Sequence, residues 1–288
     1  MENVNIRTSI FIKKKRRELD FDSLGRAKLR ESSAADRMVV TLLVSFAIIT
    51  VYTVFFRITY KWDHFMPEKL LEMAKGFLRW DTIATGQRTD MIKALINTFA
   101  LGFLTTVIGM ITGIFVALLA ARNLTRGFLP HMIRSVAAFM RAVPTIIWVL
   151  IFVAGYGLSA TTAVVGMYFH TLAFFIKSFS ESFEEVDEAT IEALKATGAN
   201  WLQIVFGAVL PSSATRLISW LAIRSEINFG VAVVIGPAVG VPGTIGTAIN
   251  NASRGGDYAT QGFGVFLVFL TAFILEVLIN RLRQRSIV

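Results

Sequence analysis

The chain has no cysteine, and charged side chains make up only 17% of its 288 residues. The absence of cysteine excludes disulfides and thiolate metal sites. A soluble domain carries roughly 25% charged residues, so the low charged fraction argues against a soluble enzyme. The Gly-Lys dipeptide is also missing, and with it the loop that binds nucleotide phosphates in ATPases.

No other catalytic or metal-binding pattern is evident in the sequence. His64, His131 and His170 are far apart and have no carboxylate at ligand spacing. A nucleophile triad is not recognisable either. We therefore expect a non-catalytic chain that binds no cofactor and no metal itself.

Hydrophobic residues are abundant and lie in long runs. They account for 54% of the chain, and the mean hydropathy is +0.60. An α-helix of about 20 apolar residues crosses a hydrocarbon core of ~30 Å. The sequence predicts an all-α integral membrane protein with six transmembrane helices, over residues 38–56, 95–121, 137–158, 161–176, 217–241 and 260–279. Gly109 and Gly113 in the second span form a pair that permits close helix packing.

The net charge of +9 comes from basic residues that flank the apolar runs. Such residues mark the cytoplasmic face of membrane proteins and meet anionic lipid head groups. We therefore expect membrane lipids as partners and no nucleic acid. With six spans and two basic ends, both termini are predicted in the cytoplasm. The basic residues over 57–93 oppose this rule, but the N-terminal arm carries more of them.

The predicted organisation has five parts. Residues 1–37 form a basic cytoplasmic arm, either a surface helix or a disordered tail, before the first span at 38–56. Residues 57–90 form an extracytoplasmic segment with an interfacial helix that begins near Pro67 and an interfacial anchor at Trp80. Residues 91–280 form the core with spans two to six, and residues 281–288 form a basic cytoplasmic tail.

A polar insertion over residues 184–216 separates the fourth and fifth spans. Asp187 is a good N-cap for a first helix, and Gly198 can adopt the left-handed conformation that ends it. Asn200 is expected to cap a second, short helix, and Pro211 to break that helix before the chain re-enters the membrane. The insertion is either a simple linker or a docking element for a soluble partner.

The spacing within this insertion resembles the signature loop of ABC-importer permeases, Glu-Ala-Ala-x3-Gly-x9-Ile-x-Leu-Pro. The chain departs from that pattern at Leu194 and Ala208, and both keep an apolar side chain. The residues that carry the resemblance, with the turn between them, are Glu192, Ala193, Leu194, Gly198, Ala199, Asn200, Trp201, Leu210 and Pro211.

Further segments resemble the permease subunit of phosphonate-type ABC importers, a family that includes importers of phosphate and phosphite. They lie at residues 141–144, 180–181, 224–228 and 236–246, and the resemblance covers roughly residues 90–280. It implies the type I importer fold with a coupling helix between spans four and five, at about 196–202. It also implies a location in the bacterial plasma (inner) membrane.

The resemblance further implies the partners. Two cytoplasmic ATPase subunits would hold ATP and Mg, an extracytoplasmic binding protein would deliver a phosphorus oxyanion, and a second copy of this chain would complete the pore. An ABC permease for another small solute, such as methionine, is the alternative. An ion-coupled secondary transporter is a further one, although only Glu226 and Glu276 could couple ions and no internal repeat is apparent.

Polar residues at membrane depth are the candidates for the translocation path. Arg224, Glu226 and Asn228 lie within one span, where an unpaired charge costs at least ~2.5 kcal/mol. They either line the path or form a structural Arg–Glu cluster, and we favour the structural interpretation. A glycine-rich break at Gly236, Gly240 and Gly243 either offers backbone N–H groups to an anion or serves as a gate.

Overall fold

The computed structural model describes residues 34–59 and 66–286, which are helical with short connections and no strand. The chain divides into two compact units, Met1–Met66 and Pro67–Val288. Residues 1–33 of the expected basic arm lie outside the described residues.

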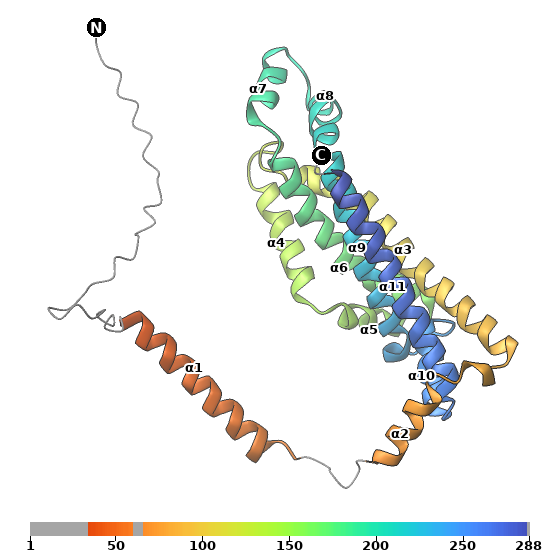
Figure 1. The fold of residues 1–288 in the computed structure, drawn as a ribbon. Coiled ribbons are helices and arrows are strands. Elements are labelled where there is room, and N and C mark those ends of the chain that lie inside the picture. Colours follow the sequence, from red (N-terminus) through yellow and green to blue (C-terminus); the bar gives the residue numbers. More distant parts are fainter. Residues whose placement is uncertain (1–33, 60–65, 287–288) are drawn as a thin grey trace, which may run out of the picture. The chain divides into compact units, whose positions relative to one another are not determined.

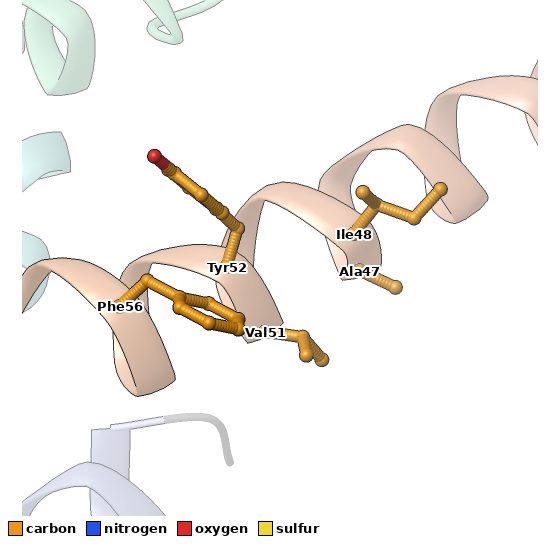
Figure 2. A pocket seen from close by; sticks show the side chains of 5 residues that line it. All are labelled: Ala47, Ile48, Val51, Tyr52 and Phe56. Atoms are coloured by element: carbon orange, nitrogen blue, oxygen red, sulfur yellow. The ribbon is translucent and has the colours of Figure 1, made fainter.

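The described part of the first unit is the apolar helix α1 (Ala34–Tyr52), which continues into a π-helical turn, Thr53–Arg57. The stretch Asp36–Arg57 is long and apolar enough to cross a membrane, in agreement with the span expected at 38–56. Figure 2 shows five of its side chains, which project from the helix without cover: Ala47, Ile48, Val51, Tyr52 and Phe56. A helix that is apolar on all sides suits a lipid environment.

The second unit is a helical bundle. Its helices are α2 (Pro67–Gly76), α3 (Thr85–Ala120), α4 (Leu129–Ala142), α5 (Thr145–Tyr156), α6 (Ala160–Glu184), α7 (Glu188–Ala196), α8 (Trp201–Ile204), α9 (Leu210–Val239), α10 (Ile245–Arg254) and α11 (Tyr258–Ser286). In Figure 1, α3, α6, α9 and α11 run along one another, and α7 and α8 project from one end of the bundle. We call this the α7 end; α2 and α10 lie at the opposite end.

The centre of the bundle is α6, which packs most extensively against α3. Gly109 and Gly113 make this approach possible, because a Cβ atom there would lie 2.7 Å from Thr171 and 2.6 Å from Phe175. The close-packing pair predicted in the second span is therefore confirmed. Phe175, Phe179 and Phe183 of α6 are fully buried in the largest apolar cluster.

The third expected span is divided into two helices. α4 and α5 meet at a bend of 88° at residues 143–144. Within the described residues, five other helices are long and apolar enough to cross a membrane, and counting this bent pair as one span gives six. Pro144 explains the division, because it has no N–H group and disfavours helical backbone at the residue before it. Gly166 of α6 lets α5 lie close, since a Cβ there would be 2.5 Å from the Cα of Val149.

Two helix ends differ from the sequence expectations. The helix of the fourth expected span continues beyond Lys177, because α6 ends at Glu184. The Lys177 ammonium lies 3.7 Å from the Glu181 carboxylate one turn later, which supports a charged residue inside the helix.

Pro211 does not break the helix either. The π-helical turn Val205–Val209 connects α8 to α9 without interruption. A π turn widens the backbone before the proline, which relieves the clash that its ring would have with a preceding carbonyl.

Trp80, the expected interfacial anchor, packs on α11. Its ring centroid lies 4.8 Å from that of Phe266 and 5.9 Å from that of Phe263. Gly262 permits this contact, because a Cβ there would lie 2.1 Å from the carbonyl oxygen of Phe77.

Candidate docking loop and polar helix interface

The hairpin of α7 and α8 has the local structure that its sequence dictates. The Asp187 side chain accepts a hydrogen bond from the backbone N–H of Ala189 at 3.2 Å and caps α7, as expected. Ile191 is buried, and Leu194 packs beside it against the main apolar cluster. One face of α7 thus attaches the hairpin to the bundle, and its opposite face is free.

The turn between the two helices is built around Gly198, which has a φ of +83°. The N–H groups of Gly198 and Ala199 donate to the carbonyls of Lys195 and Leu194 at 3.0 and 3.1 Å, a Schellman arrangement. The predicted cap at Asn200 is confirmed: its side chain accepts from the Gln203 N–H at 2.9 Å. The predicted bounds of the coupling helix, about 196–202, are wrong, because residues 197–200 form this turn.

The predicted docking residues occupy different places on the hairpin. Glu192, Ala193, Gly198, Asn200 and Trp201 are exposed. Leu194, Ala199 and Leu210 are half-buried, and Pro211 is exposed on α9. Leu202 and Phe206 beside them are 57% and 65% exposed, and sequence reasoning did not single out Phe206. Their spacing of four residues was the signal available, because it places both on one helix face.

Two consecutive glutamates tie the base of the hairpin to the bundle. Oε1 of Glu184 accepts from the Arg134 guanidinium at 2.6 Å and from the Arg122 backbone N–H at 2.7 Å. Arg134 also donates to the carbonyl of Ala120 at 2.9 Å. Glu185 pairs with Arg216 of α9. The sequence contains these charges, but no local pattern pairs them, since the partners are 50 and 31 residues apart.

Arg224 and Asn228 lie in a buried polar interface between α3, α6 and α9. Arg224 donates to the Thr171 hydroxyl at 2.9 Å, and Asn228 donates to Thr106 at 2.9 Å and to Thr171 at 3.1 Å. The Arg224 guanidinium also lies 5.1 Å from the centre of the Phe174 ring. These contacts join three helices, which favours a structural role for both residues.

Glu226 does not take part in this interface within the described residues. It is half-buried, and no ion pair joins it to Arg224 in the part of the chain that the structure describes. Two residues along a helix correspond to a rotation of about 200°, so the two side chains leave α9 on different faces. Arg224 therefore has only neutral partners in the described chain.

The glycine-rich break begins later than the sequence suggested. Gly236 and Pro237 lie inside α9, which ends at Gly240 in a left-handed conformation with φ +77°. Gly243 also has positive φ, at +71°. The Val241 N–H donates to the Gly236 carbonyl at 2.9 Å, and the Ile245 N–H donates to the Thr98 hydroxyl at 2.8 Å. These two N–H groups are bonded within the chain and are therefore not available to an anion.

A bundle of long apolar helices with a polar hairpin at one end defines a multi-pass membrane protein. Comparison with known proteins gives the family. The family described as "Binding-protein-dependent transport system inner membrane component" matches residues 109–287, more than half of the chain. The chain belongs to this family and is a multi-pass inner-membrane protein.

Curated relatives share part of this sequence. The phosphate-import permease protein PhnE of Mycolicibacterium smegmatis is 28% identical over 203 residues, which cover 69% of this chain and 37% of that protein. The phosphite transport system permease protein PtxC of Stutzerimonas stutzeri is 35% identical over 150 residues, covering 50% of this chain and 53% of that protein. The matches thus span about a third to a half of these relatives.

Solved structures confirm the fold. A chain of the inward-facing MetNI methionine ABC transporter aligns with a TM-score of 0.62 and 18% identity, over 71% of this chain and 99% of that chain. At this identity the likeness concerns the fold alone. The all-α, type I ABC-importer permease fold expected from the sequence is confirmed.

Proposed function

We propose that this chain is the transmembrane permease subunit of an ATP-binding-cassette importer for a phosphorus oxyanion: phosphonate, phosphate or phosphite. An extracytoplasmic binding protein delivers the solute, and this chain forms the translocation pathway. The observation that carries the proposal is the family match over 109–287, together with relatives named for phosphate and phosphite transport.

In this proposal the chain has no catalytic step of its own. Two copies of a cytoplasmic ATPase subunit hold ATP and Mg, and a second copy of this chain completes the pore. The α7 end faces the cytoplasm, as do both termini, so the parts 1–37 and 281–288 are cytoplasmic and 57–90 is extracytoplasmic.

The hairpin is the surface that we assign to the ATPase. Its exposed turn carries Gly198, Asn200 and Trp201 beyond the end of the bundle, and the apolar side chains of Leu202 and Phe206 are available beside it. Aromatic side chains such as those of Trp201 and Phe206 are enriched at protein interfaces.

The same hairpin has a direct mechanical connection to the membrane helices. Glu184 holds the ends of α3 and α4, Glu185 holds α9, and the Ser213 hydroxyl of α9 donates to the Ser182 carbonyl at 3.2 Å. A force on the turn when the ATPases close would therefore reach α4, α6 and α9 together. Coupling of this type requires packed elements that move as units.

Transport by the complete assembly tests the proposal. The chain is reconstituted in liposomes with the ATPase and binding protein encoded beside it, and ATP-dependent uptake of labelled phosphate is measured. Excess methylphosphonate or phosphite is added in parallel samples, and liposomes without ATP are the control. Uptake that these competitors block supports the proposal. ATPase coupling without phosphate or competitor transport would leave a permease for another solute, such as methionine.

A further inference from the structure

The central helix α6 is exposed at the surface of the subunit at one place. Between Thr162 and Glu184, every side chain of α6 is buried or half-buried except Lys177 and Glu181. These two side chains are 52% and 48% exposed, and their charged groups lie 3.7 Å apart. A helix that is otherwise covered by its neighbours thus exposes only a cation and an anion.

The exposed part of α6 lies between two neighbouring helices, α4 and α9. On one side, Ala173 and Ile176 of α6 pack against α4. On the other side, the Ser182 hydroxyl accepts a hydrogen bond from Trp220 of α9. Lys177 emerges between these contacts, on a helix face that we call the α6 stripe: His170, Phe174, Lys177 and Glu181. Positions spaced by four, three and four residues share one face of a helix.

The physical environment of a span restricts what this exposed part of α6 faces. Exposed charges are costly against lipid and occur where a helix borders water or another polar group. Lys177 lies seven residues before the end of α6, about 10 Å along the helix axis. An exposed ion pair on a helix that its neighbours otherwise cover favours an aqueous surface on this side of the subunit.

The charge around the stripe is mainly positive. The Arg224 guanidinium lies over the Phe174 ring. Its Nε atom and Nδ1 of His170 are both buried, and neither has a hydrogen-bond partner among the described residues. Glu181 is the anion beside Lys177, and half-exposed pairs on one helix contribute little energy. An incoming anion can therefore replace Glu181 at Lys177 without a large loss.

We propose that the α6 stripe lines the aqueous translocation pathway and that Lys177 is a cation that the oxyanion contacts as it passes. The part of this proposal that names an oxyanion rests on the proposed function. The part that places water along α6 does not depend on it. A weak, exchangeable contact suits a pathway, because a tight intramembrane site would slow release.

The cysteine-free sequence permits a direct test in the assembled transporter. Glu181→Cys places a single thiol beside Lys177, and Phe115→Cys on α3 provides an exposed apolar control, 64% exposed in the wild type. Both variants are treated with membrane-impermeant methanethiosulfonates, one anionic and one cationic. The reagent reacts with the thiolate form of cysteine, and a thiolate forms only where water is present. We therefore expect Glu181→Cys to be labelled roughly tenfold faster than Phe115→Cys, or more.

Comparing the anionic with the cationic reagent tests the contact between Lys177 and the oxyanion. Relative to its rate with a free thiol in solution, the anionic reagent should react faster than the cationic one at Glu181→Cys, and added Lys177→Gln should reduce that preference. Equal, slow labelling of both thiols would overturn the aqueous pathway and indicate a lysine that faces lipid. A preference that is undiminished without Lys177 would overturn its assigned role.

A transport measurement separates this proposal from the proposed function. With saturating phosphate-loaded binding protein, Lys177→Gln should lower the uptake rate about tenfold, the loss expected for one charge-assisted contact. Lys177→Arg should restore most of the uptake rate, because it keeps the positive charge. If the wild type does not take up phosphate but Glu181→Cys is labelled rapidly by the anionic reagent, the assignment of a phosphorus oxyanion as the solute is wrong. The aqueous pathway along α6 would still stand. Normal uptake by Lys177→Gln would overturn the Lys177 contact.

Discussion

Gly198 provides the sharpest test of the docking assignment. It has a φ of +83°, and a Cβ atom built on it would meet nothing within 4 Å. A substitution there therefore causes backbone strain without a steric clash. We expect Gly198→Val to disrupt the turn between α7 and α8 and leave the membrane bundle intact.

The magnitude follows from the backbone conformation. A non-glycine residue in the left-handed region costs about 1–2 kcal/mol, and a β-branched residue is a particularly poor fit. At about 1.4 kcal/mol for each factor of ten, Gly198→Val should reduce the population of the native turn roughly tenfold. The hydrogen bonds to the carbonyls of Lys195 and Leu194 depend on that turn. Gly198→Asn should cost less, because asparagine tolerates this region.

The chain contains a matched control. Gly127 has a φ of +88° and equally open surroundings, but it lies in the connection between α3 and α4. Gly127→Val therefore carries the same local strain at a site without an assigned partner. We expect ATP-dependent uptake and copurification of the ATPase to fall about tenfold for Gly198→Val and to remain near wild type for Gly127→Val.

Two results would refute this reasoning. Equal losses for Gly198→Val and Gly127→Val would mean that general strain, and not the docking turn, limits transport. Normal uptake by Gly198→Val at normal expression would mean that the turn does not engage the ATPase. The amount of each variant in the membrane is measured in the same samples.

Three further predictions concern the bundle. Gly166→Ala should destabilise the purified protein by about 1–3 kcal/mol through overpacking, whereas Gly155→Ala, which has open space around its Cβ position, should be nearly neutral in the same thermal unfolding assay. Glu184→Ala should lower thermal stability more than Glu185→Ala, because the Glu184 carboxylate is 25% exposed and that of Glu185 is 62% exposed. In the proposed homodimer, Glu226→Ala should impair assembly more than solute choice, and a fully assembled dimer with altered selectivity would contradict that expectation.

Local sequence signals predicted the hairpin well. Asp187, Gly198 and Asn200 each act on backbone groups within a few residues, so their roles as caps and as a left-handed residue follow from the sequence. The prediction at Pro211 was wrong because a π turn lies directly before it. Proline indicates a constraint on the backbone, but the surrounding helix decides between a break and a local widening.

The polar residues within the spans show the limit of sequence reasoning. Arg224 and Glu226 are near neighbours in the sequence, yet Arg224 bonds to Thr171 on another helix. Likewise, Glu184 is part of the docking segment in sequence, yet its carboxylate holds α3 and α4. The choice between these partners depends on how three or four helices pack, and no spacing in the sequence contains that information.

The sequence by itself determined the apolar spans, the absence of a nucleotide-binding loop and the capped hairpin between the fourth and fifth spans. These features arise from hydrophobicity and from hydrogen bonds over a few residues, both of which are local. Only the tertiary structure decided that α6 lies at the centre, that Arg224 has neutral partners and that Lys177 and Glu181 remain exposed. Burial and long-range pairing depend on which helices meet, and close packing around glycines such as Gly113 and Gly166 determines that arrangement.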